Sequence, residues 1–549
     1  MYPKKELAQI IITACRQFEI QTVVISPGSR NAPLTIGFSN HEDFETLSIV
    51  DERCAAFFAL GIAQQTQKPV AIVCTSGSAL LNYYPAIAEA YYSQIPLVVI
   101  SADRPKHLID IGDGQTIRQE NVFQNHILYS ANLKEFDTEN NIKSLTKGFE
   151  LLTHVKGPIH INAPFDEPLY ETVDSMSSYQ FPVQKYENEA AINYNELAAD
   201  WNAAKKKMIL VGVHAPNTEL EALLDKVADD PSVLVLTETT SNLHNKRFVN
   251  SIDNLIFNLT EEEFTSLQPD ILLTFGGLVV SKKIKKFLRD YAPKQHWHVN
   301  ELRAFDTFHV LNKHLKIDSF SFFKNFWKLV DYDNDSTYES KWTDYKNLTR
   351  EKHNKYIKTA PFSDLKVFEK VLEVIPYFSE IQFSNSSIIR YSQLYPINKT
   401  LTVFCNRGTS GIDGSTSTAI GAAYASTNPT TLITGDLSFL YDSNALWNSY
   451  IPKDFRIIMI NNSGGGIFKI IPGPKLTNSL KYFETPHCLT AEHLCKMFGF
   501  EYRIAHNLET LDKELDGFYE VSDGPKLLEI LTPSDQNDLV LKEYINSLK

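Results

Sequence analysis

The sequence predicts an α/β protein with three α/β domains, each built on a mainly parallel sheet that helices cover. Short runs of β-branched and apolar residues occur in three blocks of the chain and alternate with amphipathic segments. Such continuous apolar strands are typical of parallel sheets, because both faces of the sheet are buried. The length of 549 residues also exceeds what one hydrophobic core supports.

Each of these apolar runs is an expected strand. In the first block they lie at 22–26, 47–50, 70–75 and 97–101. Further strands begin at 207, 233 and 271 in the second block, and at 401, 431, 456 and 526 in the third. The N-terminal segment places Leu7, Ile10, Ile11, Ala14 and Phe18 on one helical face. Charged residues interrupt its apolar pattern, so we interpret it as the first helix of a domain and not as a signal peptide.

Two segments without strand patterns separate the blocks. One is the polar stretch at 174–190, and the other is a charged helical segment near 338–358. The predicted domains are therefore 1–176, 177–350 and 351–549.

Composition restricts the classes of partner and the compartment. The net charge of −13 arises from 53 Lys and Arg against 66 Asp and Glu, which excludes a general attraction to nucleic acid or anionic membranes. An anionic ligand must therefore meet a local basic cluster. Six cysteines are scattered without a CxxC pair, which argues against disulfides or a zinc site and favours a reducing compartment, the cytoplasm. No apolar run is long enough for an integral membrane segment.

Unusual residues follow four of the expected strands. They are "SPGSR" after the first, "TSGSA" after the third, "TGDLS" near 434 and "NNSGGG" near 461. Ligands of open α/β sheets bind at the carboxyl ends of the strands, so these residues are candidates for a site. The sequence Gly435-Asp436 followed by Asn461-Asn462 places a carboxylate and a side-chain carbonyl at adjacent strand ends. These hard oxygen ligands suit Mg²⁺, and the glycines let the backbone approach the ion and a diphosphate.

The same spacing is the signature of thiamine-diphosphate enzymes. Within that class the sequence resembles the MenD family, the synthases of 2-succinyl-5-enolpyruvyl-6-hydroxy-3-cyclohexene-1-carboxylate in menaquinone biosynthesis. The motifs that carry the resemblance are "VVISPGSRNAPL", "DERCAAFFALG", "TSGSALLNYYPAIAEA", "ISADRP", "GQTIRQ", "NSSIIR", "NRGTSGIDG" and "GDLSFLYDSNAL". They occur in order between residue 20 and about residue 470, whereas the middle block and the last eighty residues match loosely.

The resemblance implies a thiamine-diphosphate-enzyme architecture with a pyrimidine-binding first domain, a central α/β domain and a diphosphate- and metal-binding third domain. Its cofactors would be thiamine diphosphate and Mg²⁺, with Mn²⁺ as a substitute. Asp436, Asn462 and the Gly464 carbonyl would bind the metal. Glu52 would be the catalytic carboxylate on the aminopyrimidine ring, and Ile412 would bend the cofactor. Gly435, Leu437 and Ser438 would complete the cofactor site.

The implied activity is a transferase reaction: decarboxylation of 2-oxoglutarate and addition of the resulting succinyl carbanion equivalent to isochorismate. Both substrates are polyanions, and guanidinium groups bind carboxylates best. The resemblance assigns substrate binding to Ser29, Arg30, Arg104, Gln115, Lys282, Lys283, Arg390, Arg407 and Phe468. Two positions depart from the family pattern, because Lys283 often is Arg there and Gly466 is Gln in other members.

In this family the glutamate and the metal site of one active site belong to different subunits. The resemblance therefore implies a homodimer or a dimer of dimers, with active sites at the subunit interface.

Simpler interpretations exist for each residue by itself. Asp51 and Glu52 would complement a helix dipole, and Lys282 and Lys283 would lie on a solvated helix face. The glycine-rich turn would be an ordinary loop, and Arg30, Arg104 and Arg390 would be salt-bridge partners. Together these residues match one family's order and spacing, which favours the functional interpretation.

Three other functions compete with it. An acetohydroxyacid synthase would share Glu52 and Asp436 but would not explain "PGSR", "ADRP" and "NRGTSGIDG" together. An FAD site in the middle block lacks a GxGxxG motif there. A catalytically silent scaffold would have no chemical need for Glu52, Asp436 and Asn462 together.

Overall fold

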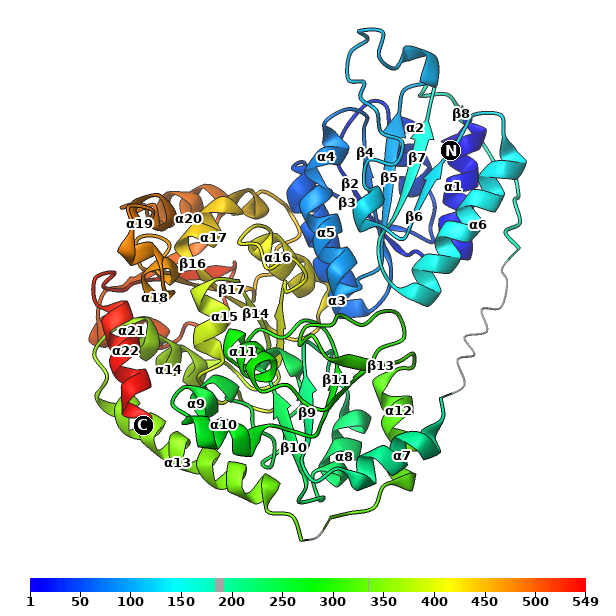
Figure 1. The fold of residues 1–549 in the computed structure, drawn as a ribbon. Coiled ribbons are helices and arrows are strands. Elements are labelled where there is room, and N and C mark those ends of the chain that lie inside the picture. The colour runs from blue at the N-terminus through cyan, green and yellow to red at the C-terminus, as the bar shows by residue number, and fades with distance from the viewer. Residues whose placement is uncertain (183–191, 334) are drawn as a thin grey trace.

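The structure is a computed structural model that describes residues 1–182, 192–333 and 335–549. It contains three parallel sheets, each covered by helices on both faces, and a two-stranded antiparallel pair, β1 (Tyr2–Pro3) with β8 (Thr172–Val173). Figure 1 shows the three sheet-centred units in different colours along the chain. This arrangement confirms the predicted α/β fold class.

The first sheet has the strand order β3-β2-β4-β5-β7-β6. Its strands are β2 (Thr22–Ile25), β3 (Glu45–Ser48), β4 (Val70–Cys74), β5 (Leu97–Asp103), β6 (Tyr129–Asn132) and β7 (Ile159–Pro164). One face packs against α1 (Glu6–Gln17), α2 (Ala32–Ser39) and α6 (Thr138–Val155). The other face packs against α3 (Glu52–Thr66), α4 (Ala79–Asn82) and α5 (Tyr84–Ser93). The predicted N-terminal helix is thus confirmed as α1.

The middle sheet has the order β10-β9-β11-β12-β13. Its strands are β9 (Lys207–Val211), β10 (Val233–Thr237), β11 (Ile271–Phe275), β12 (Gln295–Val299) and β13 (Leu311–Leu315). One face is covered by α7 (Tyr194–Ala203), α8 (Thr218–Val227) and α12 (Ser319–Phe326). The other is covered by α9 (Ile252–Ile256), α10 (Glu261–Leu267), α11 (Lys282–Asp290) and the start of α13 (Tyr338–Thr359).

The third sheet has the order β15-β14-β16-β17-β19-β18. Its strands are β14 (Glu380–Phe383), β15 (Thr402–Cys405), β16 (Thr430–Gly435), β17 (Arg456–Asn461), β18 (Glu501–Ala505) and β19 (Lys526–Leu531). One face packs against α14 (Asp364–Val374), α15 (Ser387–Ser392), α21 (Leu508–Leu515) and α22 (Asn537–Ser547). The other packs against α16 (Ser415–Ala425), α17 (Asp436–Tyr441) and α20 (Glu492–Phe498). Two short helices, α18 (Ile467–Ile470) and α19 (Leu480–Glu484), lie between β17 and α20 in the chain.

Every strand that the sequence predicted is present, with ends that shift by a few residues, as for the run at 47–50, which forms β3 at Glu45–Ser48. Among the strands of the three parallel sheets, the patterns did not predict β6, β7, β12, β13, β14 and β18. Three of these, β6, β13 and β18, lie at sheet edges and carry polar residues, as in "LNKHL" of β13. Edge strands have less surface to bury, so they need no continuous apolar run.

The domain limits stay a prediction. The linker expected at 174–190 lies partly outside the described residues, because 183–191 are not described. The limit expected at 350 lies inside α13.

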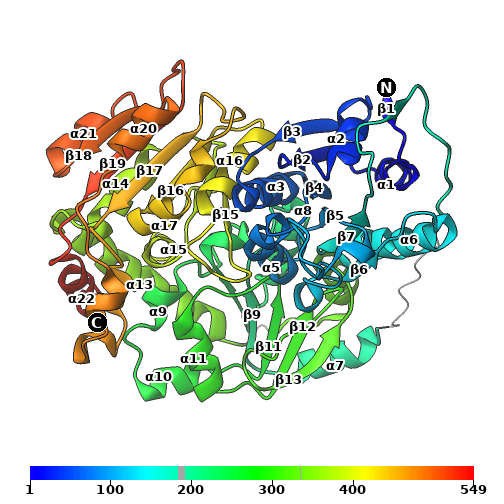
Figure 2. The ribbon, with the colours of Figure 1, turned by 90° about the horizontal axis from the view of Figure 1, so that it is seen from above.

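The first and third units share one hydrophobic core where α3 crosses α16 (Figure 2). Glycines allow the two backbones to touch. A Cβ on Gly61 would lie 2.1 Å from the Thr418 carbonyl oxygen, and one on Gly421 would lie 2.0 Å from that of Phe58. Since the obstacles are backbone atoms, a side chain at either position must push the helices apart.

Gly61→Ala is therefore expected to lower the free energy of unfolding by about 1–3 kcal/mol, as overpacked cores do. Urea unfolding checks this. Gly114→Ala is the matched control, because a Cβ there meets nothing within 4 Å, and it should unfold like the wild type. Equal unfolding midpoints for both variants and the wild type would contradict the tight crossing.

Candidate active site

Two polar residues follow adjacent strands of the third sheet. Asp436 begins α17 directly after β16, and Asn462 follows β17, which pairs with β16 in parallel. Asp436 Oδ2 accepts a hydrogen bond from the backbone N–H of Gly464 at 2.8 Å, and Oδ1 accepts one from Leu437 at 2.7 Å. Both side chains are buried. The structure therefore brings the three predicted metal ligands to one sheet edge.

This group of atoms fits a hard cation. Among the described residues, the buried Asn462 Oδ1 has no hydrogen-bond partner. Burial raises the pKa of the Asp436 carboxyl to about 6. A buried carboxylate and a buried amide oxygen without a partner both cost free energy. A divalent cation would lower this cost, because it would pair with the carboxylate and bind the amide oxygen as a ligand.

Gly464 shapes the same edge through its backbone. It has φ of +144°, and a Cβ there would lie 2.4 Å from the Glu484 carbonyl oxygen. Only glycine satisfies both conditions. Gly466, one of the departures from the family pattern, also lies against the site, because a Cβ there would be 2.9 Å from Asn462 Nδ2.

The remaining predicted cofactor residues lie beside Asp436. The Ser438 hydroxyl donates to the Ile412 carbonyl oxygen at 2.6 Å, and the Ile412 side chain is 37% exposed. The Gly435 N–H donates to the Ser384 hydroxyl at 3.3 Å. Sequence reasoning missed His487, whose Nε2 lies 3.2 Å from Asp436 Oδ2. No local motif marks this histidine, because it reaches the site only through the fold of the segment around α19.

Glu52 is the first residue of α3. Asp51 caps this helix by accepting the Cys54 N–H at 3.1 Å, as expected for a helix-start acid. Glu52 Oε2 accepts a hydrogen bond from Asn82 Nδ2 at 3.2 Å. Within the described part of the chain, no hydrogen bond or ion pair joins Glu52 to Asp436 or Asn462 of the same chain.

The neighbours of Glu52 tie α3 to the third unit. Asp51 Oδ2 accepts from Asn444 Nδ2 at 2.8 Å, and Arg53 Nη2 donates to the Tyr441 carbonyl oxygen at 2.9 Å. The start of α3 is thus hydrogen-bonded to Asn82 in the first unit and to Asn444 and Tyr441 in the third unit.

Two of the predicted substrate-binding arginines lie close together in the third unit. Arg390 Nη1 donates to the Ser386 carbonyl oxygen at 2.5 Å, and Arg407 Nη1 donates to Asn385 Oδ1 at 2.6 Å. Burial lowers the pKa of the Arg390 guanidinium, and the nearby Arg407 lowers it further. Neither arginine forms an ion pair among the described residues, which leaves both free to bind a carboxylate and contradicts the salt-bridge interpretation of Arg390.

The other two arginines are paired within the first unit. Arg30 is buried, with Nη1 on the Phe165 carbonyl oxygen at 2.9 Å and Nη2 at 3.1 Å from Glu167. Arg104 Nη1 lies 3.6 Å from Asp113. The salt-bridge interpretation therefore holds for both residues in this structure. Each keeps a buried Nε without a partner among the described residues.

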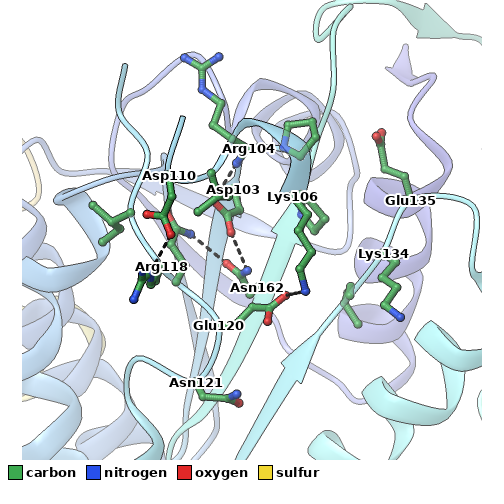
Figure 3. A pocket seen from close by; sticks show the side chains of 16 residues that line it. Asp103, Arg104, Lys106, Asp110, Arg118, Glu120, Asn121, Lys134, Glu135 and Asn162 are labelled. Atoms are coloured by element: carbon green, nitrogen blue, oxygen red, sulfur yellow. Dashed lines mark hydrogen bonds and ion pairs between the residues drawn. The ribbon is translucent and has the colours of Figure 1, made fainter. Parts of the chain in front are cut away.

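Arg104 lines a cavity of about 630 Å³ at the carboxyl ends of β5 and β7. Figure 3 shows Asp103 bonded to Asn162 in this cavity, with the ion pairs Lys106–Glu120 and Arg118–Asp110 beside it. Four acidic and four basic side chains line the cavity. The cavity therefore has no net preference for an anion.

Lys282 and Lys283 begin α11, and both are exposed. Lys283 Nζ lies 5.7 Å from the centre of the Phe257 ring. Sequence reasoning missed Lys285, which is more buried. Burial lowers its pKa, the nearby Glu238 carboxylate opposes this shift, and Arg407 lowers the pKa further.

Glu238 holds the start of α11. Its carboxylate accepts the N–H groups of Val280 and Ser281, both at 2.7 Å, and burial raises its pKa to about 7.

The remaining predicted substrate residues are placed as follows. Ser29 and Gln115 are exposed, and the ring of Phe468 in α18 lies 5.2 Å from that of Phe483.

No three His, Cys, Asp or Glu side chains gather as a metal centre among the described residues. A metal at this edge would thus depend on one carboxylate together with amide and backbone oxygens. None of the described helices has the length and apolar character to cross a membrane.

Comparisons with known proteins give the family. Residues 5–131 match the family described as "Thiamine pyrophosphate enzyme, N-terminal TPP binding domain". The fold and this match define the class: the chain is a thiamine-diphosphate-dependent enzyme. It is 54% identical to the 2-succinyl-5-enolpyruvyl-6-hydroxy-3-cyclohexene-1-carboxylate synthase of Flavobacterium johnsoniae, with 100% of both chains covered. The synthase of Flavobacterium psychrophilum is 55% identical over 100% of both chains. That of Porphyromonas gingivalis is 37% identical over 99% of this chain and 97% of its own. The chain belongs to this synthase family.

Proposed function

We propose that the chain decarboxylates 2-oxoglutarate and adds the succinyl carbanion equivalent to isochorismate, releasing CO2, as a transferase of menaquinone biosynthesis. The full-length similarity to synthases of this name supports the proposal. The observation that carries it is the buried edge of the third sheet, where Asp436 lies and where Asn462 Oδ1 has no partner among the described residues. The family relationship argues against an acetohydroxyacid synthase.

Asp436, Asn462 and the Gly464 carbonyl would hold Mg²⁺, or Mn²⁺ in its place. Thiamine diphosphate, when bound, supplies the electron sink for the decarboxylation. Gly435, Leu437 and Ser438 lie at the start of α17, where backbone N–H groups favour an anion. Ile412, tethered to Ser438 through its carbonyl oxygen, would support the bent cofactor.

Glu52 would hold a proton at the aminopyrimidine ring and is the catalytic residue of this proposal. It lies in the first turn of α3. The Asn82 side chain orients it. Since no hydrogen bond or ion pair joins Glu52 to Asp436 of its own chain among the described residues, we propose a homodimer or a dimer of dimers in which Glu52 acts on the cofactor held by the partner.

The substrates would meet separate groups of cations. Arg390 and Arg407, which carry no ion pair in the described structure, would bind 2-oxoglutarate. Isochorismate would be bound by polar and cationic side chains of the first two units, and Phe468 would form an apolar wall. These groups are Ser29, Arg30, Arg104, Gln115, Lys282 and Lys283.

Arg407→Ala is expected to raise the KM for 2-oxoglutarate and to slow the first half-reaction, whereas Arg104→Ala should impair isochorismate capture and leave decarboxylation nearly intact. Loss of one charged partner from a desolvated carboxylate costs about 2–5 kcal/mol, which kcat/KM reveals. Stopped-flow measurement with 2-oxoglutarate alone, compared with turnover in the presence of isochorismate, separates the two steps. Equal damage to both steps in both variants would mean that the cations share one pocket.

The overall function is tested by mass spectrometry of the product formed from 2-oxoglutarate and isochorismate, with and without thiamine diphosphate and Mg²⁺. A silent scaffold would form no product. Thermal denaturation gives a second test, because a ligand that binds only the native state raises the unfolding temperature. All six cysteines are unpaired, which supports our proposal of a reducing compartment, the cytoplasm.

A further inference from the structure

The carboxamide of Asn462 has two different ends, and only one of them can bind a cation. Its Nδ2 is a donor and its Oδ1 is an acceptor. We propose that Asp364 is a positioning residue that fixes this carboxamide so that Oδ1 faces the metal. The inference rests on the metal site of the proposed function.

Asp364 lies at the first position of α14, far from Asn462 in sequence, and its side chain is buried. Its Oδ2 accepts a hydrogen bond from Asn462 Nδ2 at 2.9 Å. A carboxylate offers only acceptors, so the end of the amide that faces it must be the NH₂ group. Oδ1 is then directed to the opposite side, where it has no partner among the described residues.

The carboxylate of Asp364 is itself held in place. Its Oδ1 accepts from the Thr532 hydroxyl at 2.6 Å and from Asn537 Nδ2 at 3.0 Å. Asn537 Oδ1 in turn accepts the backbone N–H of Asp364 at 2.8 Å. The starts of α14 and α22 and the end of β19 thus fix one carboxylate against the end of β17. Such partners of a metal ligand set its orientation.

Asn461 also donates its amide to a carboxylate but differs from Asn462 in the partner of its oxygen. Its Nδ2 donates to Glu529 Oε1 at 2.6 Å and to the Leu489 carbonyl oxygen at 2.9 Å. Its Oδ1 accepts the Ser463 N–H at 2.9 Å. Both ends of Asn461 are used within the protein, whereas the oxygen of Asn462 has no partner in the part of the chain that the structure describes. The two neighbouring asparagines therefore have different tasks.

The isosteric change Asp364→Asn tests the orientation. The new amide would turn its oxygen to the two donors Thr532 and Asn537, so its NH₂ group would face Asn462. Asn462 would then reverse and present its own NH₂ group to the metal. We expect the affinity for Mn²⁺ in the presence of thiamine diphosphate, measured by electron paramagnetic resonance, to fall about 10- to 100-fold.

The double variant Asp364→Asn with Asn462→Asp restores the pairing. One oxygen of the new carboxylate would accept the NH₂ group at 364 and the other would face the metal. The net charge of the pair also returns to its original value. We expect Mn²⁺ affinity to recover to within a few-fold of the wild type. Thr532→Val is the matched control: it removes one donor to Asp364 Oδ1, should lower resistance to urea, and should leave Mn²⁺ affinity within a few-fold of the wild type.

Wild-type Mn²⁺ affinity in folded Asp364→Asn would overturn the inference. A double variant that binds no better than Asp364→Asn would also overturn it, since Asp364 would then have only a structural role. Failure of the wild type to bind Mn²⁺ with thiamine diphosphate would instead reject the proposed metal site. Urea unfolding of each variant shows that the affinities refer to folded protein.

Discussion

Glu52→Gln is expected to lower turnover by about 10²–10⁴-fold, the range that general acid–base catalysis contributes. The amide has the size of the carboxylate but cannot hold a negative charge opposite the aminopyrimidine ring. Among the described residues, the Glu52 side chain accepts a hydrogen bond from Asn82, and a glutamine oxygen can accept the same bond, so the fold should persist. Steady-state turnover at saturating thiamine diphosphate is the measurement.

Glu42→Gln is the matched control for this prediction. It makes the same change from carboxylate to amide at an exposed residue of the first unit. Turnover of the control should stay near that of the wild type. Near wild-type turnover in Glu52→Gln would show that another group moves the proton.

Asp436→Ala is expected to abolish the Mg²⁺ dependence of thiamine diphosphate binding. The change removes the carboxylate from the proposed metal ligands, and the charge of the diphosphate is then poorly neutralised. We expect the affinity in Mg²⁺ to fall more than about 100-fold, beyond the effect of losing a partner of a metal ligand. Calorimetric titration of thiamine diphosphate with and without Mg²⁺ measures this.

Asp454→Ala serves as the control, because this exposed carboxylate precedes β17 at the opposite end of the same strand. It changes the net charge equally but should leave cofactor binding unchanged. Unaltered binding of thiamine diphosphate in Asp436→Ala would mean that the metal and diphosphate site lies elsewhere in the chain.

The sequence predicted the core strands well because buried parallel strands require continuous apolar runs, such as "RIIMIN" in β17. It also predicted that Asp436 and Asn462 meet, since consecutive parallel strands that pair end at the same edge. Edge strands such as β13 escaped the prediction, because they are not forced to be apolar.

The substrate residues stay predictions. Lys282, Lys283 and Lys285 share one basic run, and the resemblance assigns substrate binding to the first two. The structure exposes those two and leaves Lys285 less exposed. Which lysine of a helix faces a neighbouring unit depends on how that helix packs, and no local pattern contains this information.

The sequence by itself determined the α/β class, the family resemblance and the oxygen ligands at two strand ends, because these depend on residue types at short spacing. Only the tertiary structure decided how the carboxamides at 461 and 462 are oriented. Each turns its NH₂ group to a buried carboxylate, Glu529 for Asn461 and Asp364 for Asn462, and both carboxylates come from distant parts of the chain. Hydrogen bonds between such distant residues exist only after the chain has folded, so the role of each asparagine is a property of the assembled third unit.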